Sequence, residues 1–173
     1  PDDPAFVHPS KFVGPGYNDD EKERIAQEKG WAFEQDGDRW RRVVASPRPQ
    51  RIVEIKPIRW LLERGVIVIC TGGGGIPVIS GGKEGEILAG IEAVIDKDLA
   101  SAVLAEELSA DLLVMATDVS GVYLDWNSPG ARQIRTITPE ELKNHHFAPG
   151  SMRPKVEAAC QFVEHTQKRA AIG

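Results

Sequence analysis

From about Ile52 onward, the apolar residues fall into short continuous runs and into stripes with helical spacing. The runs at 66–70 and 112–116 are apolar at every position, as expected of strands that are covered on both faces of a sheet. A further segment at 91–95, apolar except for Glu92, predicts a third strand. Stripes of helical spacing predict helices at about 56–64, at 97–108 and from about 151 onward. A capping box of Thr138 and Glu141, with Pro139 at the first helical position, predicts another helix start. Strands that alternate with helices predict a mostly parallel sheet with helices on both faces.

The first fifty residues follow a different pattern and predict a small helix-and-hairpin excursion. Asn18 or Asp19 can cap a short charged helix that ends at Gly30. Two strand-like segments, 31–34 and 39–44, then flank Asp36-Gly37, a strong hairpin signal. We therefore expect two parts: residues 1–51 as a protruding subdomain, and residues 52–173 as an α/β core.

Length, charge and cysteine content narrow the function classes. The chain has 173 residues and a formal net charge of -5, which argues against binding to a nucleic-acid backbone. Its apolar runs are too short to cross a bilayer. Cys70 and Cys160 lie far apart at apolar positions, as expected of reduced thiols in a cytosolic protein. The start at Pro1, without a Met, suggests a piece of a longer polypeptide.

The loop after the first apolar run contains four consecutive glycines, Gly72 to Gly75. Ligands of open α/β sheets bind beyond the carboxyl ends of the strands, and glycines let backbone N–H groups surround an anion. The loop fits neither a Walker A motif nor G-x-G-x-x-G, because Pro77 stands where glycine is needed. A simple flexible loop is the alternative.

Cations stand at the starts of two predicted helices, where the helix dipole opposes them. Lys97 follows Asp96, a suitable N-cap, and both Arg153 and Lys155 lie at the start of the last helix. Lysines paired with neighbouring carboxylates would be a routine explanation. Two such helix starts after a glycine loop instead favour a shared anionic ligand such as a polyphosphate.

Two further segments contain residue types that occur in functional sites. Asp118 and Val119 follow the strand predicted at 112–116 and suit the edge of a nucleotide pocket, with Tyr123 close behind. A turn-forming aspartate is the alternative. His145 and His146 have no suitably spaced partner ligands, so no metal site is predicted there.

Long blocks of this sequence resemble the carbamate kinases of the amino-acid kinase family. The resemblance implies a three-layer α/β/α sandwich with a mostly parallel open sheet and a protruding subdomain. It also implies a homodimer that transfers a phosphoryl group between ATP and carbamate, giving ADP and carbamoyl phosphate, in arginine catabolism in the cytoplasm. Magnesium would be held mainly by the ATP phosphates. The blocks are 3–6, 9–11, 30–31, 41–44, 72–78, 92–102 and 147–159.

The same resemblance assigns roles to individual residues. Lys11 would reach the carbamate and phosphate site from the subdomain, which would act as a substrate lid. Lys97 and Lys155 would flank the transferring phosphoryl group, with Asp96 orienting them. The nucleotide pocket would be lined by Asp118, Val119, Tyr123, Met152 and Lys155, and the substrate and phosphate loop would contain Gly73, Gly74 and Gly75.

This sequence has no counterpart of the family's N-terminal segment or of its extreme C-terminus. A chain of this length alone is therefore expected to have little turnover. Two other functions stay open. One is another amino-acid kinase, which the block around Lys11 disfavours. The other is a nucleotide-binding protein without catalysis, which would bind ADP but form no ATP from carbamoyl phosphate.

Overall fold

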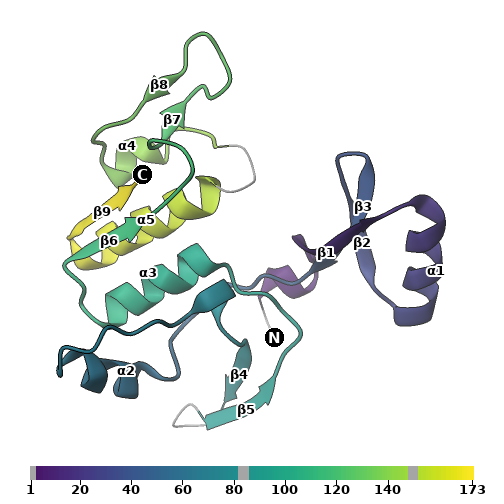
Figure 1. Ribbon diagram of the computed structural model, residues 1–173, viewed down its shortest axis with the longest axis horizontal. Helices are drawn as coiled ribbons and strands as arrows, with labels where there is room; N and C mark the ends of the chain where they lie inside the picture. The colour runs from purple at the N-terminus through teal and green to yellow at the C-terminus, as the bar shows by residue number, and fades with distance from the viewer. Residues whose placement is uncertain (1–2, 82–85, 148–151) are drawn as a thin grey trace. The chain divides into compact units, whose positions relative to one another are not determined.

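The computed structural model describes residues 3–81, 86–147 and 152–173 and divides the chain into two compact units. The first unit contains residues 1–48 and 75–95, and the second contains residues 49–74 and 96–173. The chain therefore leaves the first unit after Arg48 and returns to it at Gly75. We describe each unit separately, with the elements labelled as in Figure 1.

The first unit contains a three-stranded antiparallel sheet, order β1-β3-β2, and a separate antiparallel pair of β4 and β5. Its elements are η1 (Pro4–Phe6, a 3-10 turn), β1 (Lys11–Tyr17), α1 (Asp19–Lys29), β2 (Ala32–Asp36), β3 (Arg39–Val44), β4 (Val78–Gly81) and β5 (Glu86–Gly90).

The helix and hairpin predicted for the first fifty residues are confirmed. Asn18 caps α1 in a capping box with Glu21, and Gly30 ends the helix with a left-handed φ of 66°. Asp36 pairs with Arg39 across the hairpin turn, where Gly37 has a φ of 65°. Strand β1 was not predicted, because Gly14-Pro15-Gly16 interrupts its pattern and shifts its register against β3 between Val13 and Gly16.

The second unit contains two helices packed on a parallel strand pair, with a small antiparallel pair nearby. Its elements are α2 (Ile55–Leu62), η2 (Gly72–Gly74, a 3-10 turn), α3 (Lys97–Glu107), β6 (Leu112–Met115), β7 (Tyr123–Leu124), β8 (Arg132–Gln133), α4 (Pro139–Leu142), α5 (Met152–Thr166) and β9 (Arg169–Ile172). Helices α3 and α5 lie side by side, and β6 lies beside β9 (Figure 1).

The core of this unit lies between the two helices and one face of the β6–β9 sheet. Leu113 of β6 pairs in register with Ala170 of β9, and Met115 pairs with Ile172. These four side chains share one face of the sheet and belong to the same apolar cluster as residues of α3 and α5. The helix residues of the cluster are Leu99, Ala102, Ala105, Ala158, Ala159, Phe162 and Val163. Both helices therefore cover the same face of the sheet.

Two predicted strands are wrong. Residues 66–70 and 91–95 form no strand. The segment 66–70 is apolar enough for a buried strand, but a strand also needs a hydrogen-bonded neighbour, and none pairs with it in the described ranges. In the segment 91–95, the N–H of Val94 donates to the carbonyl of Ala45 at 2.9 Å without forming a ladder.

The other helix predictions agree with the structure. Helices α2 and α3 lie close to the predicted ranges, and Thr138 caps α4 in a capping box with Glu141. The predicted start of α5 at Ser151 lies outside the described residues, and the described helix begins at Met152. Strand β9 completes the parallel pair. None of the helices within the described ranges is long and apolar enough to span a membrane.

The apolar cluster predicts that two large-to-small substitutions change the free energy of unfolding by very different amounts. Phe162→Ala removes a fully buried ring and should lower the free energy of unfolding by about 3–5 kcal/mol. Ile67→Ala removes a side chain that is 91% exposed and should change it by less than about 0.5 kcal/mol. Urea unfolding followed by circular dichroism measures both, and equal effects would contradict the assignment of the core.

The two free cysteines should react at different rates. Cys160 is buried in α5, and burial raises the pKa of its thiol, whereas Cys70 is partly exposed. The thiolate is the reactive form, so iodoacetamide at pH 8 should modify Cys70 first. Mass spectrometry of timed samples measures the order, and denaturation in urea should remove the difference.

Candidate active site

The start of α3 is fixed by a buried aspartate. Asp96 is the N-cap, and its Oδ1 accepts hydrogen bonds from the backbone N–H groups of Asp98 at 2.9 Å and Leu99 at 3.4 Å. These bonds satisfy donors that have no partner within the helix. The cap therefore determines where the helix begins and where the next two side chains, Lys97 and Asp98, emerge.

A buried ion pair joins the start of α3 to the start of α5. Lys155 lies in the first turn of α5, and its Nζ donates to Oδ1 of Asp98 at 3.0 Å. Both side chains are about 10% exposed. Because two charges have been taken out of water, each depends on the other for compensation.

The ion pair also offsets the unfavourable interaction of Lys155 with the helix dipole. A cation in the first turn of a helix is opposed by the helix dipole, and the carboxylate of Asp98 supplies the compensating charge. A lysine ammonium has three N–H donors, and the Asp98 bond uses one of them. Among the described residues, Asp98 is the partner of this ammonium, which leaves donors for a further acceptor.

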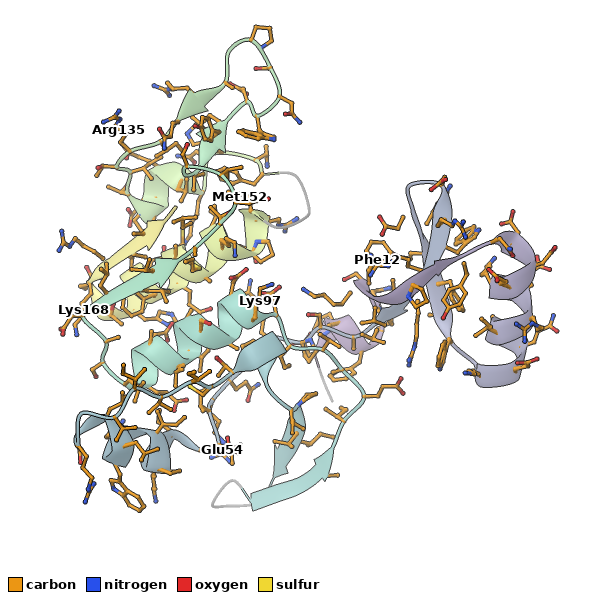
Figure 2. All side chains as sticks on the ribbon, in the orientation of Figure 1. Phe12, Glu54, Lys97, Arg135, Met152 and Lys168 are labelled. Carbon is orange, nitrogen blue, oxygen red and sulfur yellow. The ribbon has the colours of Figure 1, made fainter. Side chains whose placement is uncertain are left out.

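Lys97 lies at the same end of the helix pair as Lys155. It is the first residue of α3 and is exposed, and Figure 2 shows its side chain at the end of α3 that lies beside Met152, the first residue of α5. Asp98 is its neighbour in the chain. The structure therefore brings two of the predicted lysines to the common end of α3 and α5.

The glycine turn packs beside α3. Gly73 and Gly74 belong to η2, which contacts α3, and Gly74 donates from its N–H to the carbonyl of Thr71 at 2.8 Å. Gly73, Gly74 and Gly75 have positive φ values of 68°, 100° and 83°. Such a run needs glycine, since other residues avoid this region. Gly75 itself belongs to the first unit.

The predicted nucleotide-pocket residues lie around the loop that follows β6. Asp118 is exposed and accepts a hydrogen bond from the Thr117 hydroxyl at 3.2 Å. The Tyr123 hydroxyl is 2.8 Å from that of Ser120, and its ring meets Trp126 edge-on at 5.0 Å. Val119 is partly buried in the same loop.

The two remaining predicted site residues, Met152 and Lys11, lie in different units. Met152 packs against the second apolar cluster of the unit, which contains Val122, Leu142, Val156 and Cys160. Lys11 is the first residue of β1 and pairs in register with Val44 in the first unit. Its role as a lid residue therefore stays a prediction.

Two surface hollows of the second unit contain none of the predicted site residues. One, of about 420 Å³, lies between the β7–β8 pair and α4, and the other, of about 550 Å³, is lined by Pro57, Trp60, Leu61 and Arg64 of the α2 region. Within the described ranges, no three His, Cys, Asp or Glu side chains form a group that could hold a metal.

Sequence reasoning missed Asp98, because it assigned Asp96 as the carboxylate that orients the lysines. The spacing contained a usable signal. Asp98 lies four and seven positions before Ala102 and Ala105, on the buried face of α3. Lys155 lies four and seven positions before Ala159 and Phe162, on the buried face of α5. A carboxylate and an ammonium on two facing apolar stripes are expected to pair.

Comparison with known proteins places the chain in a family. The sequence profile of the amino acid kinase family matches residues 21–173. A carbamate kinase of Haemophilus influenzae is 55% identical over 171 residues, which is 99% of this chain and 54% of that protein. A carbamate kinase of Pyrococcus furiosus is 50% identical over 98% of this chain and 55% of its own length.

Solved structures agree with this placement. A crystal structure from Aeropyrum pernix has a TM-score of 0.90 at 47% identity, and a carbamate kinase from Giardia lamblia bound to AMP-PNP has a TM-score of 0.83 at 43% identity. This chain covers 56% and 55% of those two chains. The chain belongs to the amino acid kinase family, and it spans about half the length of the relatives that it matches.

The Asp98–Lys155 pair should contribute far more to stability than an exposed pair of the same kind. Asp98→Ala leaves the Lys155 ammonium buried without a counter-charge and should cost about 3–5 kcal/mol. Asp98→Ala combined with Lys155→Met should cost less than the two single changes added together. Urea unfolding of the wild type, both single variants and the double variant measures the coupling.

The matched control is the exposed pair of Arg153 and Glu157, four residues apart on α5 and 2.8 Å apart. Arg153→Ala should cost only about 0.3–0.5 kcal/mol, the usual contribution of such a pair. Additive effects at Asp98 and Lys155 would show that the two side chains do not depend on each other.

Proposed function

We propose that this chain is the nucleotide-side part of a carbamate kinase, which transfers a phosphoryl group reversibly between ATP and carbamate. The observation that carries the proposal is the buried Asp98–Lys155 pair, set beside Lys97 at the common end of α3 and α5. Relatives that are 50–55% identical over nearly the whole chain and are named carbamate kinases support the choice of substrate.

Phosphoryl transfer needs positioning and charge neutralisation more than a covalent nucleophile. A lysine about 4 Å from a phosphate oxygen contributes on the order of 4 kcal/mol at an effective dielectric constant near 20, before desolvation is subtracted. Lys97 would supply an exposed, movable charge and Lys155 a fixed one. Asp98 would hold Lys155 in place, and Asp96 would fix the start of the helix that presents Lys97.

Further parts of the proposal follow from the family resemblance. The nucleotide would lie against Asp118, Val119, Tyr123 and Met152, with Gly73–Gly75 near its phosphates and Lys11 approaching from residues 1–51 as a lid. When bound, Mg²⁺ would neutralise phosphate charge. The complete protein would be a cytoplasmic homodimer with a three-layer α/β/α fold and a role in arginine catabolism.

A nucleotide-binding protein without catalysis is the second candidate function, because membership of a fold family does not by itself imply a shared activity. ADP binding without ATP formation from carbamoyl phosphate, in the longest natural polypeptide that contains this sequence, would favour that function over catalysis.

Replacement of Lys97 tests the proposed mechanism in the same polypeptide. Lys97→Ala should lower ATP formation from ADP and carbamoyl phosphate by at least 100-fold, because a charge that faces the phosphoryl group is lost. Its thermal midpoint should change little, since the side chain is exposed. Lys143→Ala, at an exposed lysine that pairs with Glu164, is the control and should keep most of the activity. Unchanged turnover in Lys97→Ala would remove Lys97 from the mechanism.

A further inference from the structure

The hollow of about 420 Å³ between the β7–β8 pair and α4 is lined by both apolar and cationic side chains. The apolar ones are Leu124, Ile134 and Ile137, and the cationic ones are Arg132 and Arg135. Pockets that bind small molecules usually have this size and combine apolar lining with a few polar groups. The hollow therefore has the composition of a ligand site.

The two arginines of the hollow are unpaired. Within the part of the chain that the structure describes, neither Arg132 nor Arg135 forms an ion pair or a side-chain hydrogen bond. Figure 2 shows Arg135 on the segment that leads from β8 to α4. Arg41, Arg42 and Arg153, by contrast, each pair with a carboxylate. Two unpaired guanidinium groups at one hollow leave several strong N–H donors for an anion.

The acidic residue at this hollow is engaged elsewhere. Glu141 is the one carboxylate among the described lining residues. Its Oε2 accepts from the N–H of Thr138 at 3.2 Å and from the Thr138 hydroxyl at 3.4 Å, in the capping box of α4. Two arginines against one carboxylate leave a net positive charge, and the His145 ring adds a further N–H donor. The lining therefore favours an anionic ligand.

The chain that bears the two arginines is fixed on both sides of β8. Nε2 of Gln133 donates to the carbonyl of Ser120 at 2.6 Å, and the N–H of Ile134 donates to the carbonyl of Val122 at 2.8 Å. Ile134 and Ile137 also pack against the second apolar cluster. The backbone of the arginine segment is thus held in place before a ligand binds, which lowers the entropic cost of binding.

The hollow is separate from the predicted nucleotide pocket. Leu124 lines the hollow, whereas its neighbour in β7, Tyr123, does not and instead places its hydroxyl 2.8 Å from that of Ser120. Successive side chains of a strand point to opposite faces, so the two sites lie on opposite faces of β7. Neither Lys97 nor Lys155 lines the hollow. An anion bound here would not occupy the candidate active site.

We propose that this hollow binds a small phosphate monoester with an apolar body. Guanidinium groups bind phosphate oxygens in a bidentate way, and a phosphate monoester carries about 1.5 to 2 negative charges at pH 7, which suits two arginines. Leu124, Ile134 and Ile137 are placed to contact the apolar body. The proposal goes beyond phosphoryl transfer, and it does not rest on carbamate as the substrate.

The test uses phenyl phosphate as the probe and the longest natural polypeptide that contains this sequence. Amide hydrogen exchange locates the bound probe, and we expect slower exchange in residues 132–137 and 141–145. Calorimetry measures affinity, and inorganic phosphate should bind about tenfold more weakly because it has no apolar body to bury. Unchanged exchange in both ranges, or equal affinity for the two probes, would overturn the proposal.

Two variants test the arginines directly. Arg132→Gln and Arg135→Gln should each weaken phenyl phosphate binding about tenfold or more. The thermal midpoint should change little, because both side chains are exposed. Arg24→Gln, at an exposed arginine of the first unit, removes the same charge elsewhere and should bind the probe normally.

Lys97→Ala separates this hollow from the candidate active site and should also bind phenyl phosphate normally. If Lys97→Ala loses binding while both arginine variants keep it, the probe occupies the candidate active site and the proposal is wrong. Since the readouts are binding and exchange, the result does not depend on whether this protein transfers phosphoryl groups.

Discussion

The pairing of Lys155 with Asp98 is the constraint on which the second unit depends. An ammonium and a carboxylate that are both about 10% exposed must face each other, because neither has enough water to stabilise its charge alone. The pair therefore fixes the starts of α3 and α5 against each other. Below it, alanines and Phe162 allow the helices to pack closely on Leu113 and Met115.

That helix pair in turn determines the parallel strands. Strand β6 follows α3, β9 follows α5, and both strands present one face to the same helices. A strand that returns through a helix to lie parallel to an earlier one is the βαβ arrangement, which uses the helix to cover the sheet. The result is a candidate site at the helix starts and a core at the sheet, and the same two helices organise both.

The helices could be predicted from sequence because their ends are encoded locally. Asn18 with Glu21, Thr138 with Glu141 and the Asp96 cap each determine a helix start through bonds within three residues. Strands depend on residues far away in the chain. Residues 66–70 have the composition of a buried strand and form none in this structure, whereas β1 forms despite Gly14-Pro15-Gly16 because β3 is available beside it.

The same holds for the candidate site: the lysines could be found from local sequence, whereas the partner of Lys155 depends on how two distant helices pack. Lys97 and Lys155 could be found because a cation at a helix start conflicts with the dipole, a conflict visible in the sequence alone. The partner of Lys155 could not be chosen by that rule, since Asp96 and Asp98 both suit a first turn. The choice depends on which carboxylate lies on the buried stripe of α3, opposite the stripe of α5. Asp96 is occupied with capping the helix backbone, and this leaves Asp98, one turn before Ala102, to meet the lysine.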